Sequence, residues 1–307
     1  MVFALAACSA STGEAQGSSS GSTEAIATEV SAPQKIAEDT TAVSMSFTPP
    51  EGYATVNRHF EYAPDGSVVD KSFTYQFEDK SECIIGYTKG KEITDEIPQS
   101  YLDDAEVIEY SGKSFSVVTQ GSNIMAVCQD GDIVYGVGWS FSDEADRDKF
   151  DSLMNKISFT DNTETVENGD DLYAIRYTLD SSLNVVSINN NLTETPDGEA
   201  VDKSISWYYG TDKDNIDFRL LIKVFKNSTV EKEVSTDYKT EEIELGGITY
   251  TAIYNSDTDE KPFAYYTQQG SDVYQIRNMG KSGGWSTTRS DESYEALEKL
   301  MNTVRFE

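Results

Sequence analysis

Apolar and polar residues alternate over short stretches through most of the chain, a pattern typical of half-buried β-strands. The first such set is Val43, Met45 and Phe47, which serine and threonine residues separate. Turn sequences such as Pro-Asp-Gly and Gln-Asp-Gly-Asp stand between the alternating stretches. Because Asp-Gly and Pro favour tight turns, the pattern predicts antiparallel strands joined by hairpins.

The alternation gives way twice to a helical period. In the first case apolar residues recur at the spacing of one helix face, and Ser142 is a candidate N-cap. In the second case Ser290 is the candidate N-cap. We expect both apolar faces to pack on a sheet. They consist of Phe150, Leu153, Met154 and Ile157 in the first helix, and Tyr294, Leu297, Met301 and Val304 in the second.

One stretch of nine residues occurs twice. Pro64–Ser72 reads PDGSVVDKS, and Pro196–Ser204, 132 residues later, reads PDGEAVDKS. An alternating aromatic strand follows each copy, and the two helices share the sequence Leu-Met-Asn. We therefore predict a tandem duplication, with module 1 at residues 43–160, a linker at 161–170 and module 2 at 171–307. Strands followed by one helix predict an α+β fold, in which each module is an antiparallel sheet with a C-terminal helix packed on it.

The amino terminus carries a candidate lipid-attachment signal. Leu5-Ala6-Ala7-Cys8 resembles a bacterial lipobox, which implies cleavage before Cys8 and a diacylglycerol on its thiol. Residues 1–8 hold only the end of the apolar stretch that a signal peptide needs, so we expect the true start to lie upstream. Residues 9–42 are rich in Ser, Thr, Gly, Ala and Glu, which predicts a flexible tether. The alternative to a lipobox is a chance Ala-rich terminus.

Charge excludes one class of partner. The chain has 54 acidic and 24 basic residues and a net charge of −30. Such a surface repels nucleic acid and anionic lipid headgroups, so we expect no nucleic-acid partner. The acidity fits solubility at a negatively charged cell surface, and a dedicated cation-binding role is the alternative. No stretch reaches the roughly 18 apolar residues of a membrane-spanning helix, so attachment would be by lipid.

Four segments of the first repeat form a set of motifs: Pro50–Tyr53, Asp104–Glu109 with Gly112-Lys113, Val134–Gly138 and the closing helix. With these motifs, the first repeat resembles a domain family of unknown function found in Gram-positive bacteria, in extracytoplasmic lipoproteins and in the outer parts of anti-sigma factors. Cys128 stands where that family often has tryptophan, and Asp180–Leu183 replaces the first motif in the second repeat. The resemblance implies a location outside the cytoplasmic membrane and offers no catalytic residues.

Two features of the sequence are candidates for a chemical centre. His59 is the only histidine, so a Ser-His-Asp or Cys-His centre would have to use it. We expect it to be a surface or hairpin residue instead. The segment Asp212–Asp217 resembles a calcium loop but lacks the central glycine and the bidentate glutamate. We expect a solvated turn there, with a weak calcium site as the alternative.

The cysteines and the aromatic residues each allow two interpretations. Cys83 and Cys128 are either two buried thiols or one disulfide, because an exported protein permits both. Trp207, Tyr209, Tyr265 and Trp285 belong either to the core and ordinary surface or to a face that binds carbohydrate or peptide.

Together these features predict a non-catalytic, lipid-anchored binding or sensing protein on the outer face of the cytoplasmic membrane of a Gram-positive-type bacterium. We expect no cofactor and no metal. The partner would be an unknown protein, peptide or glycan, besides the membrane that the lipid on Cys8 contacts. A carboxylate-based envelope hydrolase and a structural spacer or assembly subunit are the alternatives.

Overall fold

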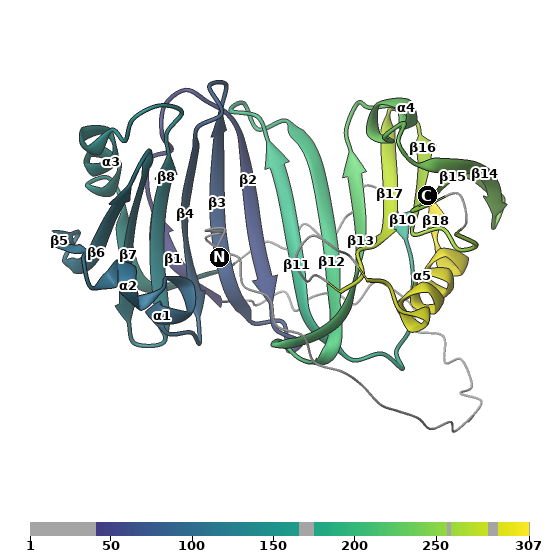
Figure 1. Cartoon of the computed structure of the whole chain (residues 1–307), viewed down its shortest axis with the longest axis horizontal. Helices are drawn as coiled ribbons and strands as arrows, with labels where there is room; N and C mark the ends of the chain where they lie inside the picture. Colours follow the sequence, from purple (N-terminus) through teal and green to yellow (C-terminus); the bar gives the residue numbers. More distant parts are fainter. Residues whose placement is uncertain (1–40, 166–174, 257–258, 282–287, 307) are drawn as a thin grey trace.

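The computed structural model describes residues 41–165, 175–256, 259–281 and 288–306. Its main feature is one antiparallel sheet of 14 strands (Figure 1). Strands β2 and β11 pair in the middle of this sheet, and seven strands form each arm. From the middle outwards, the first arm is β2 (Tyr53–Tyr62), β3 (Val68–Phe77), β4 (Glu82–Lys89), β8 (Ile133–Ser140), β7 (Asn123–Asp130), β6 (Lys113–Gln120) and β5 (Glu106–Tyr110).

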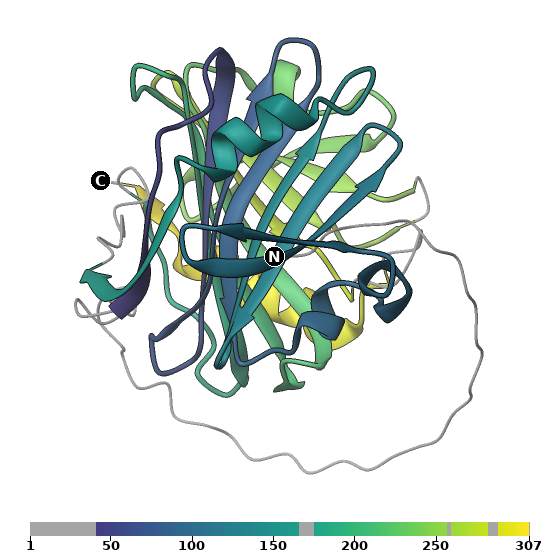
Figure 2. The same cartoon turned by 90° about the vertical axis from the view of Figure 1, so that its left-hand side faces the viewer.

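The second arm repeats this order. It runs outwards as β11 (Val185–Glu194), β12 (Ala200–Asp212), β13 (Asn215–Phe225), β17 (Asp272–Asn278), β16 (Ala264–Gln269), β15 (Ile248–Tyr254) and β14 (Lys239–Leu245). Each arm thus has three strands in chain order and then four in reverse order. Figure 2, seen from the β5 end, shows strands at the near end turned relative to those behind, as the twist of a large sheet requires.

Smaller elements accompany each arm. Two short sheets pair β1 (Thr41–Ser46) with β9 (Ser158–Thr165), and β10 (Ile175–Arg176) with β18 (Arg305–Phe306). Helix α3 (Arg147–Met154) belongs to the first arm and α5 (Asp291–Thr303) to the second. The remaining helices have one turn each: α1 (Ile93–Glu96), α2 (Gln99–Leu102) and α4 (Val230–Glu233).

The core lies on the face of the sheet that α3 and α5 cover. Phe150 of α3 and Leu297 of α5 are fully buried and belong to one continuous hydrophobic cluster. Alternation along each strand supplies the sheet side of this cluster, for example Tyr75 of β3 and Ile222 of β13. The predicted faces are buried at Phe150, Leu153 and Met154 of α3 and at Leu297 and Met301 of α5. Tyr294 is half-buried, and Ile157 and Val304 are buried just beyond the helix ends.

The predicted fold class needs correction. Strands, not a balance of strands and helices, make up most of the regular structure, and the sheet is continuous rather than one per module. The physical reason is that β2 and β11 each pair with one hairpin partner and keep a second edge, and these two edges pair with each other. In an unpaired strand that edge would expose backbone donors and acceptors.

Several boundaries also differ. Helix α3 begins after Asp146, whose side chain accepts a hydrogen bond from the Lys149 amide, whereas Ser142 donates to Asp79. Strand β9 continues to Thr165, into the segment expected as a linker. Ser290 caps α5 as predicted. The lipobox with Cys8 and nearly all of the predicted tether lie outside the described residues. In the described ranges no helix has the length and apolar character needed to cross a membrane.

Candidate functional site

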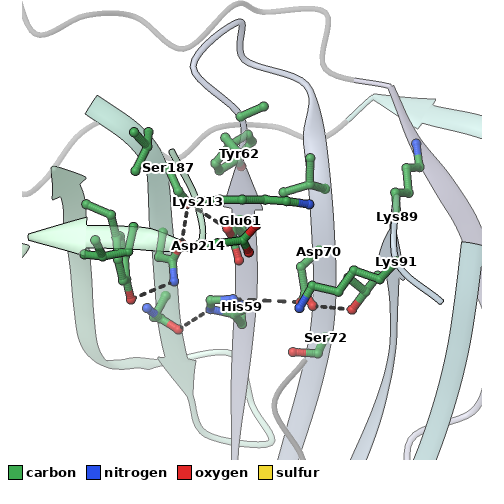
Figure 3. Close-up of a pocket in the computed structure, with 18 of the residues that line it drawn as sticks. His59, Glu61, Tyr62, Asp70, Ser72, Lys89, Lys91, Ser187, Lys213 and Asp214 are labelled. Carbon is green, nitrogen blue, oxygen red and sulfur yellow. Dashed lines mark hydrogen bonds and ion pairs between the residues drawn. The ribbon is translucent and has the colours of Figure 1, made fainter. Parts of the chain in front are cut away.

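A polar pocket lies on the opposite face of the sheet from α3 and α5, where the two arms meet. Alternation places His59 and Glu61 of β2, Asp70 and Ser72 of β3, and Asn191 of β11 toward it. The cavity volume is about 560 Å³. Figure 3 shows His59, Glu61, Asp70 and Ser72 on adjacent strands, facing the same space.

His59 lies at the centre of this pocket. Its Nδ1 is 2.9 Å from Oδ1 of Asn191, an atom that can only accept, so Nδ1 carries the proton in this hydrogen bond. Its Nε2 lies 3.8 Å from Oδ1 of Asp70. The side chain of Asp70 is 1% exposed, and its Oδ2 accepts a 2.7 Å hydrogen bond from Thr88. The imidazole is therefore held between an amide of one arm and a carboxylate of the other.

A second hydrogen-bonded chain crosses the junction beside His59. The hydroxyl of Ser187 donates to Glu61 at 2.7 Å, which joins β11 to β2. Asn189 donates to the Tyr208 hydroxyl at 3.1 Å, and Arg219 donates to the same oxygen at 2.8 Å. These contacts fix the wall of the pocket that the second arm provides.

Lysines line the rim. Lys89 is the last residue of β4 and Lys91 follows it, and the β12–β13 hairpin brings Lys213 and Asp214 to the same pocket (Figure 3). Burial lowers the pKa of Lys91, but the ion pair with Glu96, at 3.1 Å, and the charges of Glu61 and Asp70 together raise it above its ordinary value.

The pocket offers carboxylates, amides, hydroxyls and ammonium groups within one space. Such a set can hold a small polar molecule that both donates and accepts hydrogen bonds. Among residues 41–165, 175–256, 259–281 and 288–306, no three His, Cys, Asp or Glu side chains group as a metal site would require.

Three of the four aromatic residues belong to the core, which is the first of their two interpretations, and not to a ligand face. Trp207, Tyr209 and Tyr265 are only 3%, 2% and 7% exposed, because alternation turns them toward the covered face of the sheet. There Trp207 packs edge-on against Tyr177, and Tyr209 stacks on Phe218. Trp285 lies outside the described residues.

His59 lies on β2 in the β2–β3 hairpin, as expected, and it also lines the pocket. The sequence did contain a signal for this site. Asn57, His59 and Glu61 form a polar set of period two, and Asn189 and Asn191 form another. What the sequence did not reveal is that these two sets share one face.

The Asp212–Asp217 segment contains an exposed turn, as predicted: residues 213–214 join the end of β12 to the start of β13. One carboxylate oxygen of Asp212 accepts hydrogen bonds of 3.0 Å from the backbone amides of Asp214 and Asn215. Hydrogen bonding to Asn215 and to these backbone groups lowers the pKa of Asp212. The turn therefore stabilises its own conformation and carries Lys213 and Asp214 to the pocket.

Cys83 and Cys128 are buried free thiols, which confirms the first of the two interpretations. Cys83 lies on β4 and Cys128 on β7, and β8 runs between these strands. On β8, Cys83 is opposite Trp139, whereas Cys128 is opposite Tyr135. Two cysteines on strands that are not neighbours are too far apart for a disulfide.

No protein-family model matches the chain, and the search of curated proteins finds no match. The similar solved structures include MucB in complex with MucA(peri), the Pseudomonas aeruginosa MucA/MucB complex and MucB itself, at 11%, 10% and 12% identity. The matches cover 83%, 83% and 89% of this chain and 94%, 93% and 95% of those chains. Their TM-scores are 0.20, 0.20 and 0.21, which are too low to carry an argument about fold or function.

Proposed function

We propose that this chain is an extracytoplasmic binding protein that holds a small polar ligand in the pocket between its two arms. The observation that carries the proposal is the pocket around His59, where buried and half-buried polar groups from both arms converge. Burying polar groups costs free energy unless they are hydrogen-bonded. A folded protein that keeps so many of them beside one cavity gains specificity for a polar ligand in return.

In this proposal the arms are duplicated modules, each with its closing helix. The common strand order of the two arms supports the duplication, as does the spacing of the two Pro-Asp-Gly turns. The burial of Phe150 and Leu297, one in each closing helix, is a further support. A duplicated module would create the pocket by joining two equivalent polar strand faces, so that neither copy contains the whole site.

We take the pocket to be non-catalytic. A hydroxyl nucleophile activated by His59 would donate its proton to the imidazole. Instead, the hydroxyls of Ser187 and Thr88 donate to the carboxylates of Glu61 and Asp70. This arrangement supports binding, because the groups that would have to react hold one another in place.

A carboxylate-based hydrolase is the second candidate, because Glu61 and Asp70 are opposite each other on adjacent strands and line one pocket. Hydrolysis of nitrophenyl glycosides that is abolished in Glu61→Gln and in Asp70→Asn would favour this candidate. Turnover that is absent, or is unchanged in both variants, favours the binding protein.

Ligand binding can be tested through the NMR resonances of His59. Since the chain has one histidine, its imidazole gives one set of NMR resonances, which needs no assignment among several residues. We expect members of a library of neutral and zwitterionic polar molecules, such as N-acetylglucosamine and dialanine, to shift these resonances saturably. Ser187→Ala should weaken the response, and Ser114→Ala, an exposed serine on β6, should not. Resonances that no library member moves contradict the proposal.

We further propose that Cys8 carries the lipid that holds the protein on the outer face of the membrane. The lipobox resemblance and the polar composition of residues 9–42 support this. Expressed behind a complete signal peptide, the wild type should partition into detergent and Cys8→Ala into the aqueous phase. Equal partitioning of the two forms contradicts the anchor.

A further inference from the structure

We infer that Arg277 and Arg289 form a second binding site, which takes an oxyanion group, a carboxylate or a phosphate. The site is independent of the proposed function. It belongs to the outer half of the second arm, since Arg277 is on β17 and Arg289 directly precedes the N-cap of α5. In Figure 1 both elements lie at the right-hand end of the sheet, away from the β2–β11 junction.

The two arginines share one aromatic support. Phe263, which is 3% exposed, has its ring centroid 5.2 Å from the guanidinium carbon of Arg277 and 4.2 Å from that of Arg289. Tyr238 packs edge-on against the same ring at 5.6 Å and is itself 40% exposed. Contact with an aromatic ring restricts each guanidinium. Nε of Arg289 donates a 2.9 Å hydrogen bond to the backbone carbonyl of Asn278, so a ligand would use the terminal N–H groups of that guanidinium.

Neither arginine forms an ion pair with a described carboxylate. Within the part of the chain that the structure describes, neither arginine has a carboxylate within the 4.0 Å of an ion pair. In the same protein Arg58 lies 2.8 Å from Glu194, and Arg147 lies 2.9 Å from Asp151. With 54 acidic residues in the chain, an arginine pair without an ion-pair partner is unexpected and needs a reason.

Burial makes the lack of a partner costly. Burial lowers the pKa of Arg289, and the neighbouring charge of Arg277 lowers it further, against the opposing effects of Tyr294, Tyr238 and Asp259. The Nε atom of Arg277 is buried and has no hydrogen-bond partner. A buried donor without an acceptor costs stability that a bound acceptor would recover.

Two acidic side chains of this region already accept hydrogen bonds. Asp259 accepts a hydrogen bond of 2.8 Å from Ser256, and Glu233 accepts one from Ser228. Two guanidinium groups on one support match the oxygen pairs of a carboxylate or phosphate, which arginine binds through paired N–H groups. The geometry therefore selects an oxyanion, and Tyr238 provides an apolar surface for whatever carries it.

The test is calorimetric titration of the full chain with sodium phosphate, sodium acetate and sodium chloride at matched ionic strength. We expect saturable binding of phosphate, acetate or both, and none of chloride. Saturation by phosphate alone identifies a phosphorylated ligand, and saturation by acetate alone identifies a carboxylate. Absence of saturable binding by both oxyanions overturns the inference.

Variants separate this site from general charge effects. Arg277→Gln and Arg289→Gln should each weaken oxyanion binding about tenfold or more, as the loss of a charge-assisted hydrogen bond implies. The matched control is Arg147→Gln, which changes the net charge equally in the first arm and should bind like the wild type. Arg277→Lys and Arg289→Lys keep the charge but lose the paired N–H groups, and should bind at an intermediate level. Equal binding by all variants overturns the inference, and thermal melts confirm that each is folded.

Discussion

His59 of β2 and Asn191 of β11 lie directly opposite each other and share a 2.9 Å hydrogen bond, although 132 residues separate them in the chain. The same interval separates the two Pro-Asp-Gly turns. The two residues at matching positions of the repeated sequence therefore meet at the middle of the sheet. Around them, contacts between unlike side chains make the polar pocket asymmetric, with an imidazole on one strand and an amide on the other.

Removing this amide should weaken the junction. We expect Asn191→Ala to lower the free energy of unfolding by about 1–2 kcal/mol, because His59 loses a partly buried hydrogen-bond acceptor. Urea denaturation measures this difference. Asn123→Ala, at an exposed position on β7, is the control and should stay within about 0.5 kcal/mol of the wild type. Equal effects of the two substitutions would show that the His59 contact contributes no stability.

The two closing helices should be about equally important to the fold. Phe150→Ala and Leu297→Ala each remove a fully buried side chain, so we expect losses of about 3–5 and 2–5 kcal/mol of unfolding free energy. Glu295→Ala, on the exposed face of α5, is the control. A loss below about 1 kcal/mol for either core substitution would show that its helix is not packed as described.

The buried side chain of Lys71 should make the free energy of unfolding increase with pH in the alkaline range. Burial, with a smaller effect of Arg58, lowers the pKa of Lys71 from 10.5 to about 8. Between about pH 8 and 10.5 the unfolded chain therefore keeps a proton at this residue that the folded chain has lost, so the contribution of Lys71 to stability increases with pH. Below pH 8 both states are protonated, and the cost of burying the charge is fully present.

The measurement is urea denaturation of the wild type and Lys71→Met across this pH range. The variant should be more stable than the wild type below pH 8, and the gap should close as the pH approaches 10.5. Lys156→Met, at an exposed position, should follow the wild type throughout. A constant gap across the range contradicts the prediction.

The buried thiols should be present but slow to react. Burial raises the pKa of both Cys83 and Cys128, which lowers the fraction of reactive thiolate. In a Cys8→Ser background without reductant, Ellman's reagent should label both thiols rapidly in urea and far more slowly in the folded protein. Failure to label them in urea would indicate a disulfide and contradict the strand order β4-β8-β7.

Local patterns in the sequence were sufficient to predict the strands and the helix faces. The alternation around Phe73 and Tyr75 lies within β3, and the spacing of Leu297 and Met301 lies within α5. The start of α3 was predicted wrongly because Ser142 and Asp146 are both good N-caps. The choice depends on a contact outside the helix, since Ser142 bonds to Asp79.

The site could not be predicted as a whole, because it depends on pairing between distant strands. The polar face of β2 is visible in the sequence as Asn57, His59 and Glu61, but nothing local indicates that β11 lies beside it. The location of the aromatic residues, in the core or on a ligand face, could not be decided from the sequence for a related reason. Trp207 belongs to an alternating strand, and alternation alone does not say which face a helix covers.

The central claim is that the sheet continues across β2 and β11 in the observed register, so that both arms build one pocket. Disulfide formation tests it directly in a Cys8→Ser background. Asn57 and Thr193 are paired across the junction with side chains 3.0 Å apart, so Asn57→Cys with Thr193→Cys should cross-link readily in the folded protein. Asn57→Cys with Ser187→Cys, six residues out of register along β11, should not. Cross-linking that is equally slow in both pairs would contradict the continuous sheet and the pocket built on it.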